Sequence, residues 1–99
     1  MDMKTLVSEM DAAVKAFGKT PSAATFAPVP KIKEAIEEKI DDMPAAKRAP
    51  FSKAIADMGM YVQAISSQLA MPMVNVAMFA GTYVPQMKAA ISSMAAALE

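Results

Sequence analysis

The chain has 99 residues, 55% of them hydrophobic, and its ten basic side chains balance ten acidic ones. This length predicts a single small domain, and the zero net charge argues against a dedicated nucleic-acid-binding protein, which needs surplus Lys and Arg to meet phosphate groups. The chain also has no Cys and no His, which excludes disulfides and thiolate catalysis and removes the commonest general base and metal ligand. The high apolar content and the low glycine content, three residues, favour an all-α fold.

The first predicted helix covers residues 2–17. Its apolar residues recur at steps of four and three, which places them on one side of a helix: Met3, Val7, Met10, Val14 and Phe17. Gly18 follows at a position that favours a C-cap residue with positive φ. Residues 19–30 contain three prolines and no helical period, so they predict a loop that Phe26 and Val29 anchor to the core.

Two shorter helices are predicted next. Pro30 opens a helix whose apolar edge has a spacing of four residues: Ile32, Ile36 and Ile40. The two aspartates and the proline within residues 41–44 then predict the start of a short helix. This helix ends near Arg48, where the helix dipole favours a cation.

A longer helix is predicted to begin at Pro50. Its apolar residues follow at steps of four and three, a pattern typical of the seam of a helical bundle: Phe51, Ile55, Met58, Val62, Ile65 and Leu69. A row of small or polar residues that includes Gly59 runs beside the seam. Because glycine inside a helix costs about 1 kcal/mol relative to alanine, Gly59 predicts the close approach of a neighbouring helix.

Near Pro72 the sequence predicts a break in the form of a kink, beyond which the apolar seam continues through Val76, Phe79 and Tyr83. Gly81 and Thr82 predict a stop, and the final helix, with Pro85 in its first turn, carries an apolar stripe: Met87, Ala90, Ile91 and Met94. The whole pattern predicts a small bundle of four to five helices, with a proline-rich loop at 19–30, in a single domain over residues 1–94. Residues 95–99 resemble the product of a cloning site.

One tripeptide resembles part of a nucleotide-binding motif. Gly18, Lys19 and Thr20 match the end of a phosphate-binding loop. That motif, however, needs a glycine where Ala13 stands and a strand where a helix is predicted, and Pro21 blocks the helix that should follow. The tripeptide therefore predicts a helix end, and no nucleotide cofactor is expected.

Two other patterns suggest metal ligands but lack the partners that such sites need. Carboxylates at Glu34, Glu38 and Asp42 share one side of a helix, but carboxylate metal sites in bundles take further ligands from His, which is absent. The Met-x-Met pairs at 58–60 and 71–73 carry thioethers that suit Cu(I), yet residues two apart on a helix point in different directions. No metal and no other cofactor is expected.

The distribution of charge predicts an interaction surface. Residues 58–99 contain only Lys88 and Glu99 as charged residues, and eight of the 11 methionines lie between Met43 and Met94. A chain this small cannot cover such a segment on every side, and monomers rarely expose large apolar patches. The expected interface residues lie on this segment: Gly59, Met60, Met71, Met73, Met78, Phe79, Tyr83 and Met87.

These observations predict a non-enzymatic helical module for protein interaction or assembly, cytoplasmic, that self-associates or binds another protein through residues 58–94. The alternative is a helical protein that associates with a membrane or another apolar surface, because residues 58–87 are uncharged and long enough to span a bilayer. Polar residues such as Gln63, Gln68 and Asn75 lower the hydropathy of that segment. An enzyme remains a third possibility, without any catalytic constellation to support it.

Overall fold

The part of the chain that the computed structural model describes, residues 2–71 and 75–98, takes all its regular structure from helices. The helices are α1 (Met3–Lys19), α2 (Ala23–Phe26), α3 (Pro28–Asp41), α4 (Ala45–Leu69) and α5 (Val76–Ala97). This result confirms the predicted all-α class and the small bundle of four to five helices.

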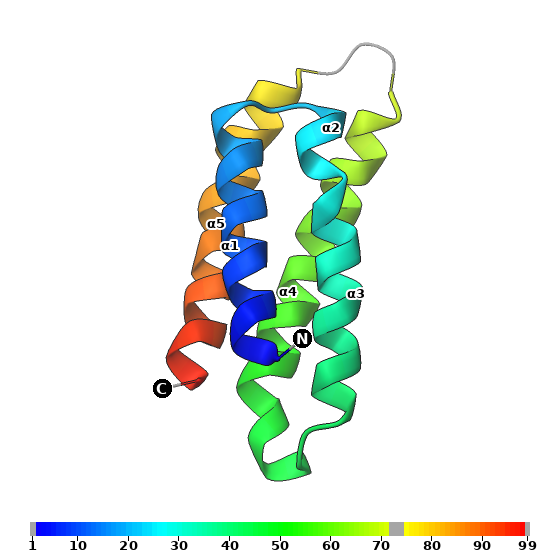
Figure 1. Ribbon diagram of the computed structural model, residues 1–99. Helices are drawn as coiled ribbons and strands as arrows, with labels where there is room; N and C mark the ends of the chain where they lie inside the picture. The colour runs from blue at the N-terminus through cyan, green and yellow to red at the C-terminus, as the bar shows by residue number, and fades with distance from the viewer. Residues whose placement is uncertain (1, 72–74, 99) are drawn as a thin grey trace.

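The four long helices run up and down in turn and form a bundle with extents of 44 × 21 × 20 Å. α1 packs against α3 and α5, and α4 packs against the same two helices. In Figure 1, α1 and α3 lie in front of α5 and α4, and the short α2 lies at the top beside α1 and α3. α4 and α5 therefore form one layer of the bundle, and the outer side of this layer points away from α1 and α3.

Each long helix contributes one apolar stripe to a common core. The stripe of α1 is buried from Leu6 to Phe17, and that of α4 is buried from Phe51 to Ile65. The largest fully buried side chains come from all four long helices: Met10, Phe17, Ile36, Met58, Ile65, Met87 and Met94. Among the described residues no polar or charged side chain is buried, so apolar packing holds the bundle together.

The predicted loop at 19–30 is wrong, because only residues 20–22 separate α1 from α2 and α3 begins at Pro28. Ser22 starts α2 with a capping box: its Oγ accepts the Thr25 N–H at 3.1 Å, and the Thr25 hydroxyl accepts the Ser22 N–H at 3.1 Å. Pro28 and Pro30 lie in the first turn of α3, where a missing N–H breaks no helical hydrogen bond.

The anchors predicted for this segment are confirmed, but the predicted helix cap is not. Phe26 and Val29 are both buried, and the Phe26 ring packs against Phe17 with a centroid separation of 5.1 Å. Gly18 lies inside α1, and no described glycine has a positive φ. α1 continues to Lys19 because its last turn still packs against α5.

A helix does start next to the predicted position 41–44, but the capping role predicted for Asp41 and Asp42 is wrong. Asp41 is the last residue of α3 and Asp42 is its C-cap, while α4 begins at Ala45. The side chain of Arg48 explains this arrangement: its Nε donates to the Met43 carbonyl at 2.7 Å and its Nη2 donates to the Asp41 carbonyl at 2.6 Å. The guanidinium thus satisfies carbonyl groups that the end of α3 leaves without helical partners.

Two predicted helix boundaries lie inside continuous helices. α4 passes through Pro50, and α5 passes through Gly81, Thr82 and Pro85. In α5, continuity keeps the apolar stripe in the core on both sides of Pro85, and this burial outweighs the local preference for a break. In α4 the buried residues begin at Phe51, directly after Pro50. The predicted break near Pro72 lies outside the described residues. α5 continues to Ala97, three residues beyond the predicted domain end.

Candidate functional site

Among the described residues, the exposed large apolar side chains are Met60 on α4, Met71 just after α4, Met78 on α5 and Leu98 at the C-cap of α5. Met60, Met71 and Met78 are 66%, 55% and 65% exposed. Three half-buried aromatic rings join the two helices beside them: Tyr61 lies 6.0 Å from Tyr83, and Phe79 lies 6.5 Å from Tyr83, between ring centroids. These six residues form what we call the methionine–aromatic patch: Met60, Tyr61, Met71, Met78, Phe79 and Tyr83.

Helical periodicity explains why these methionines point outward while others are buried. Met60 is two residues from Met58 and from Val62, which are both in the core. Two residues correspond to about half a turn, so the Met60 side chain lies on the opposite side of α4. Met78 is related to the buried Ala80 of α5 in the same way.

The patch residues belong to an uncharged part of the sequence, although Lys53 and Asp57 line the groove beside Tyr61. The sequence has no Asp, Glu, Lys or Arg between Asp57 and Lys88. Polar groups are limited to amides and hydroxyls such as those of Gln68, Asn75 and Thr82, and the Thr82 hydroxyl donates to the Met78 carbonyl at 3.1 Å. The patch residues themselves can therefore contact an apolar surface without removing a charge of their own from water.

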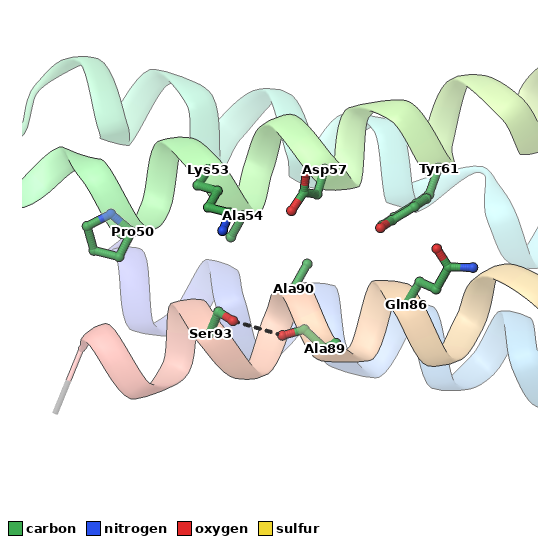
Figure 2. A pocket seen from close by; sticks show the side chains of 9 residues that line it. All are labelled: Pro50, Lys53, Ala54, Asp57, Tyr61, Gln86, Ala89, Ala90 and Ser93. Carbon is green, nitrogen blue, oxygen red and sulfur yellow. Dashed lines mark hydrogen bonds between the residues drawn. The ribbon is translucent and has the colours of Figure 1, made fainter.

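A groove of about 420 Å³ lies between α4 and α5 next to the patch, as Figure 2 shows. Ala54 and Ala90 point toward one another across it, and both are buried. Its other lining residues form a mostly polar rim: Pro50, Lys53, Asp57, Tyr61, Gln86, Ala89 and Ser93. The ion pairs of the described residues, Lys15–Asp11 and Lys33–Glu37, include neither Lys53 nor Asp57.

The groove has the features of a docking surface more than those of a catalytic centre. The small side chains on both helices allow another molecule to approach closely, and the Ser93 hydroxyl donates to the Ala89 carbonyl at 3.1 Å. Its polar groups can accept or donate hydrogen bonds at the rim. Among the described residues no cluster of three or more acidic side chains could hold a metal ion.

Five of the predicted interface residues reach the surface. Met60, Met71 and Met78 are exposed, and Phe79 and Tyr83 are half-buried and pack against one another. Met87 is fully buried in the core and is therefore removed from the candidate surface. Its burial shows that absence of charge does not by itself identify surface residues, because the position of a residue around the helix decides whether it faces the core.

Two further predicted residues do not contribute to the patch. Gly59 faces α3, because a Cβ atom on this glycine would lie 3.0 Å from Cε of Lys33. The close approach predicted at Gly59 is thus a contact inside the chain with a flexible side chain. Met73 lies outside the described residues.

The prediction from the sequence missed Tyr61 and the whole groove. Tyr61 stands four residues after Asp57 and seven before Gln68, a spacing that places the three on one side of the helix, next to the apolar seam. This spacing could have identified Tyr61. The groove requires knowledge of which residues of α5 lie opposite Ala54, and the sequence contains no signal for that pairing.

Comparison of the chain with protein-family models, with curated proteins and with solved structures finds no match. In residues 2–71 and 75–98 no helix combines the length and the apolar character needed to cross a membrane. The function of the chain must therefore be inferred from the patch and the groove themselves.

Proposed function

We propose that the chain is a non-enzymatic helical assembly module that self-associates through one surface. This surface, the α4–α5 face, is the outer side of the α4–α5 layer and includes the methionine–aromatic patch and the adjacent groove. One observation carries this proposal: three methionines more than half exposed lie in an uncharged part of the sequence, and the next most exposed large apolar side chain of the described residues is Leu98, at 37%. Methionine is flexible and polarisable, and it is favoured on surfaces that adapt to an apolar partner.

The dimensions of the bundle support a second copy as the partner. A bundle 44 Å long and about 20 Å wide has a side whose projected area is comparable to the roughly 800 Å² per partner that a standard stable interface buries. Two-fold dimers are the commonest protein oligomers and need one self-complementary surface. The α4–α5 face is large enough to provide it.

Lipid is the less favoured occupant of this face. Helices that lie in a membrane interface usually flank their apolar side with Lys and Arg, which bind anionic headgroups. Lys53 lines the groove, but the 34 residues between Lys53 and Lys88, which carry the patch, contain no Lys or Arg. The missing cations favour protein over lipid as the partner.

Sedimentation equilibrium of the purified chain over roughly 1–100 µM, the range for a modest interface, tests the proposal. We expect a monomer–dimer equilibrium that Met60→Glu and Met78→Glu each shift toward monomer without changing the helical circular dichroism. Ala12→Glu places the same charge on an exposed position of α1 and should leave the equilibrium unchanged. A wild-type chain that stays monomeric over the whole range, or that associates only with added lipid vesicles, would overturn the proposal.

A further inference from the structure

On the α4–α5 face a side chain that projects outward, Met78, and a residue that lines the groove, Ala89, lie on the same side of α5. We call these positions the raised part and the hollow part of the face. Met78 projects from the face, 65% exposed, whereas Ala89 lines the groove. The two residues are 11 positions apart, which is close to three helical turns, so their side chains leave α5 on the same side. The rise per residue separates them by roughly 16 Å along the helix axis.

The two-fold axis of a face-to-face dimer lies in the plane of the interface, and its two limiting directions are along the bundle and across it. If the axis runs along the bundle, the copies are parallel and the groove of one lies over the groove of the other. The hollow then remains unfilled, and the atoms that line it gain no packing partners. If the axis runs across the bundle, the copies are antiparallel, and the raised part of each lies over the hollow of the other.

We infer that two copies associate in the antiparallel arrangement, with Met78 of each copy placed in the α4–α5 groove of the other; this inference rests on the self-association proposed above. The axis lies halfway between Met78 and Ala89, at the level of Tyr83. Tyr61 is at the same level on α4, because its ring is 6.0 Å from that of Tyr83. An isologous contact of this kind needs no second type of surface.

The chemistry of the groove suits a thioether. Ala54 and Ala90 provide an apolar floor, and the volume of about 420 Å³ admits a methionine side chain without displacing the lining residues. Methionine fills irregular spaces because it has three rotatable bonds and no branch. Lys53 and Asp57 stand on the rim with opposite charges, so the hollow part of the face adds no net charge to the contact.

Disulfide trapping tests the arrangement, since the chain has no native Cys that could form other crosslinks. Equal amounts of Met78→Cys and Ala89→Cys, mixed and treated with the thiol oxidant diamide, should give a covalent dimer that neither variant gives alone. Thr82→Cys alone should also crosslink, because it lies next to the axis and leaves both Met78 and the groove intact. Met78→Cys mixed with Ser8→Cys on α1 is the matched control and should give no dimer.

The outcomes separate this inference from the proposed function. A parallel dimer would place Met78 against the α4 helix of the second copy, so Met78→Cys would crosslink with Ala64→Cys and not with Ala89→Cys. That result, or a sedimenting dimer in which Thr82→Cys does not crosslink, overturns the antiparallel arrangement while self-association stands. A chain that sediments only as monomer overturns both.

Discussion

Gly18 of α1 lies directly against Val84 of α5: a Cβ atom on the glycine would be 3.3 Å from Cγ1 and 3.6 Å from Cγ2 of the valine. Val84 is buried, and its β-branched side chain has few alternative rotamers. The Val84 side chain therefore cannot easily move away from a methyl group added at Gly18. The close approach of helices through glycine, which the sequence suggested for Gly59, is found at Gly18.

Replacing Gly18 with alanine should fail to stabilise the protein. The gain of about 1 kcal/mol in helix propensity is opposed by overpacking against Val84, which typically costs about 1–3 kcal/mol. Chemical denaturation should therefore show unchanged or lower stability for Gly18→Ala. In a Val84→Ala background the same substitution should become stabilising, and a double-mutant cycle with no coupling would contradict the contact.

Gly59→Ala should raise the melting temperature, in contrast to Gly18→Ala. The atom nearest to the added methyl group is Cε of Lys33, at 3.0 Å, on a flexible side chain whose Nζ binds Glu37 at 2.6 Å. Lys33 can move by a few tenths of an ångström, so part of the helix-propensity gain of about 1 kcal/mol remains.

Gly81→Ala is the matched comparison for Gly59, because nothing lies within 4 Å of its added Cβ position. It should raise the melting temperature by about 4–8 °C, the shift that 1 kcal/mol gives a domain of this size. Thermal unfolding followed by circular dichroism measures both variants. A melting temperature for Gly59→Ala below that of the wild type would show that Lys33 cannot move aside.

The apolar periodicity predicted the core well, because each helix buries one side regardless of how the loops connect the helices. Met58 and Ile65 were placed in the seam and are buried. Local proline and glycine signals were less reliable, since Pro50 and Gly81 both lie inside continuous helices. The preference of one residue for a helix end is smaller than the free energy of keeping a whole stripe in the core.

The sequence predicted only part of the candidate surface, because it does not show how the helices pack together. The absence of charge identified the correct segment, but charge alone does not separate Met60 from Met87, which differ in helical phase. The groove depends on the pairing of Ala54 with Ala90 across two helices. Such a pairing arises from the packing of the whole bundle, so no local pattern in α4 or α5 encodes it.

Truncation of Ile65 should be far more destabilising than truncation of an acidic surface residue. Ile65 is fully buried in the core, and Ile65→Ala should lower the free energy of unfolding by about 2–5 kcal/mol. Glu38 is exposed on α3, and Glu38→Ala should change that free energy by no more than about 0.5 kcal/mol. Urea denaturation measures both, and the reverse order would show that the phase assigned to α4 is wrong.

Acidification should weaken the start of α1. Oδ1 of Asp2 accepts the Thr5 N–H at 2.8 Å, and this hydrogen bond lowers the pKa of Asp2 from its ordinary value. Because the pKa is lower in the folded state, the stabilisation is complete above the unfolded-state pKa and is lost as the pH falls through the folded-state pKa.

Asp2→Asn isolates this effect, because asparagine keeps an oxygen that can cap the helix but has no charge to titrate. We expect the stability advantage of the wild type over Asp2→Asn to shrink as the pH is lowered, in thermal unfolding at a series of pH values. An NMR titration of the Asp2 carboxyl group should give a pKa below that of an unfolded peptide. A difference between the two proteins that does not vary with pH would contradict the assignment.

Peroxide should distinguish the methionines of this chain by their position. Hydrogen peroxide transfers one oxygen atom to the thioether sulfur and leaves as water, and exposed methionines react first. Met60 and Met78 are more than half exposed, whereas Met58 and Met87 are fully buried. We expect mass spectrometry with fragment-ion assignment to find sulfoxide early at Met60 and Met78, and only after unfolding at Met58 and Met87.

The same reaction should depend on protein concentration if the α4–α5 face is an interface. Association buries Met60 and Met78, so their oxidation rate should fall as the chain is concentrated, and the sulfoxide, which is polar, should then disfavour reassociation. Met58 is the internal control, because its burial within one chain does not change on dimerisation. Oxidation rates at Met60 and Met78 that stay constant from dilute to concentrated protein would mean that neither side chain is covered by a second copy.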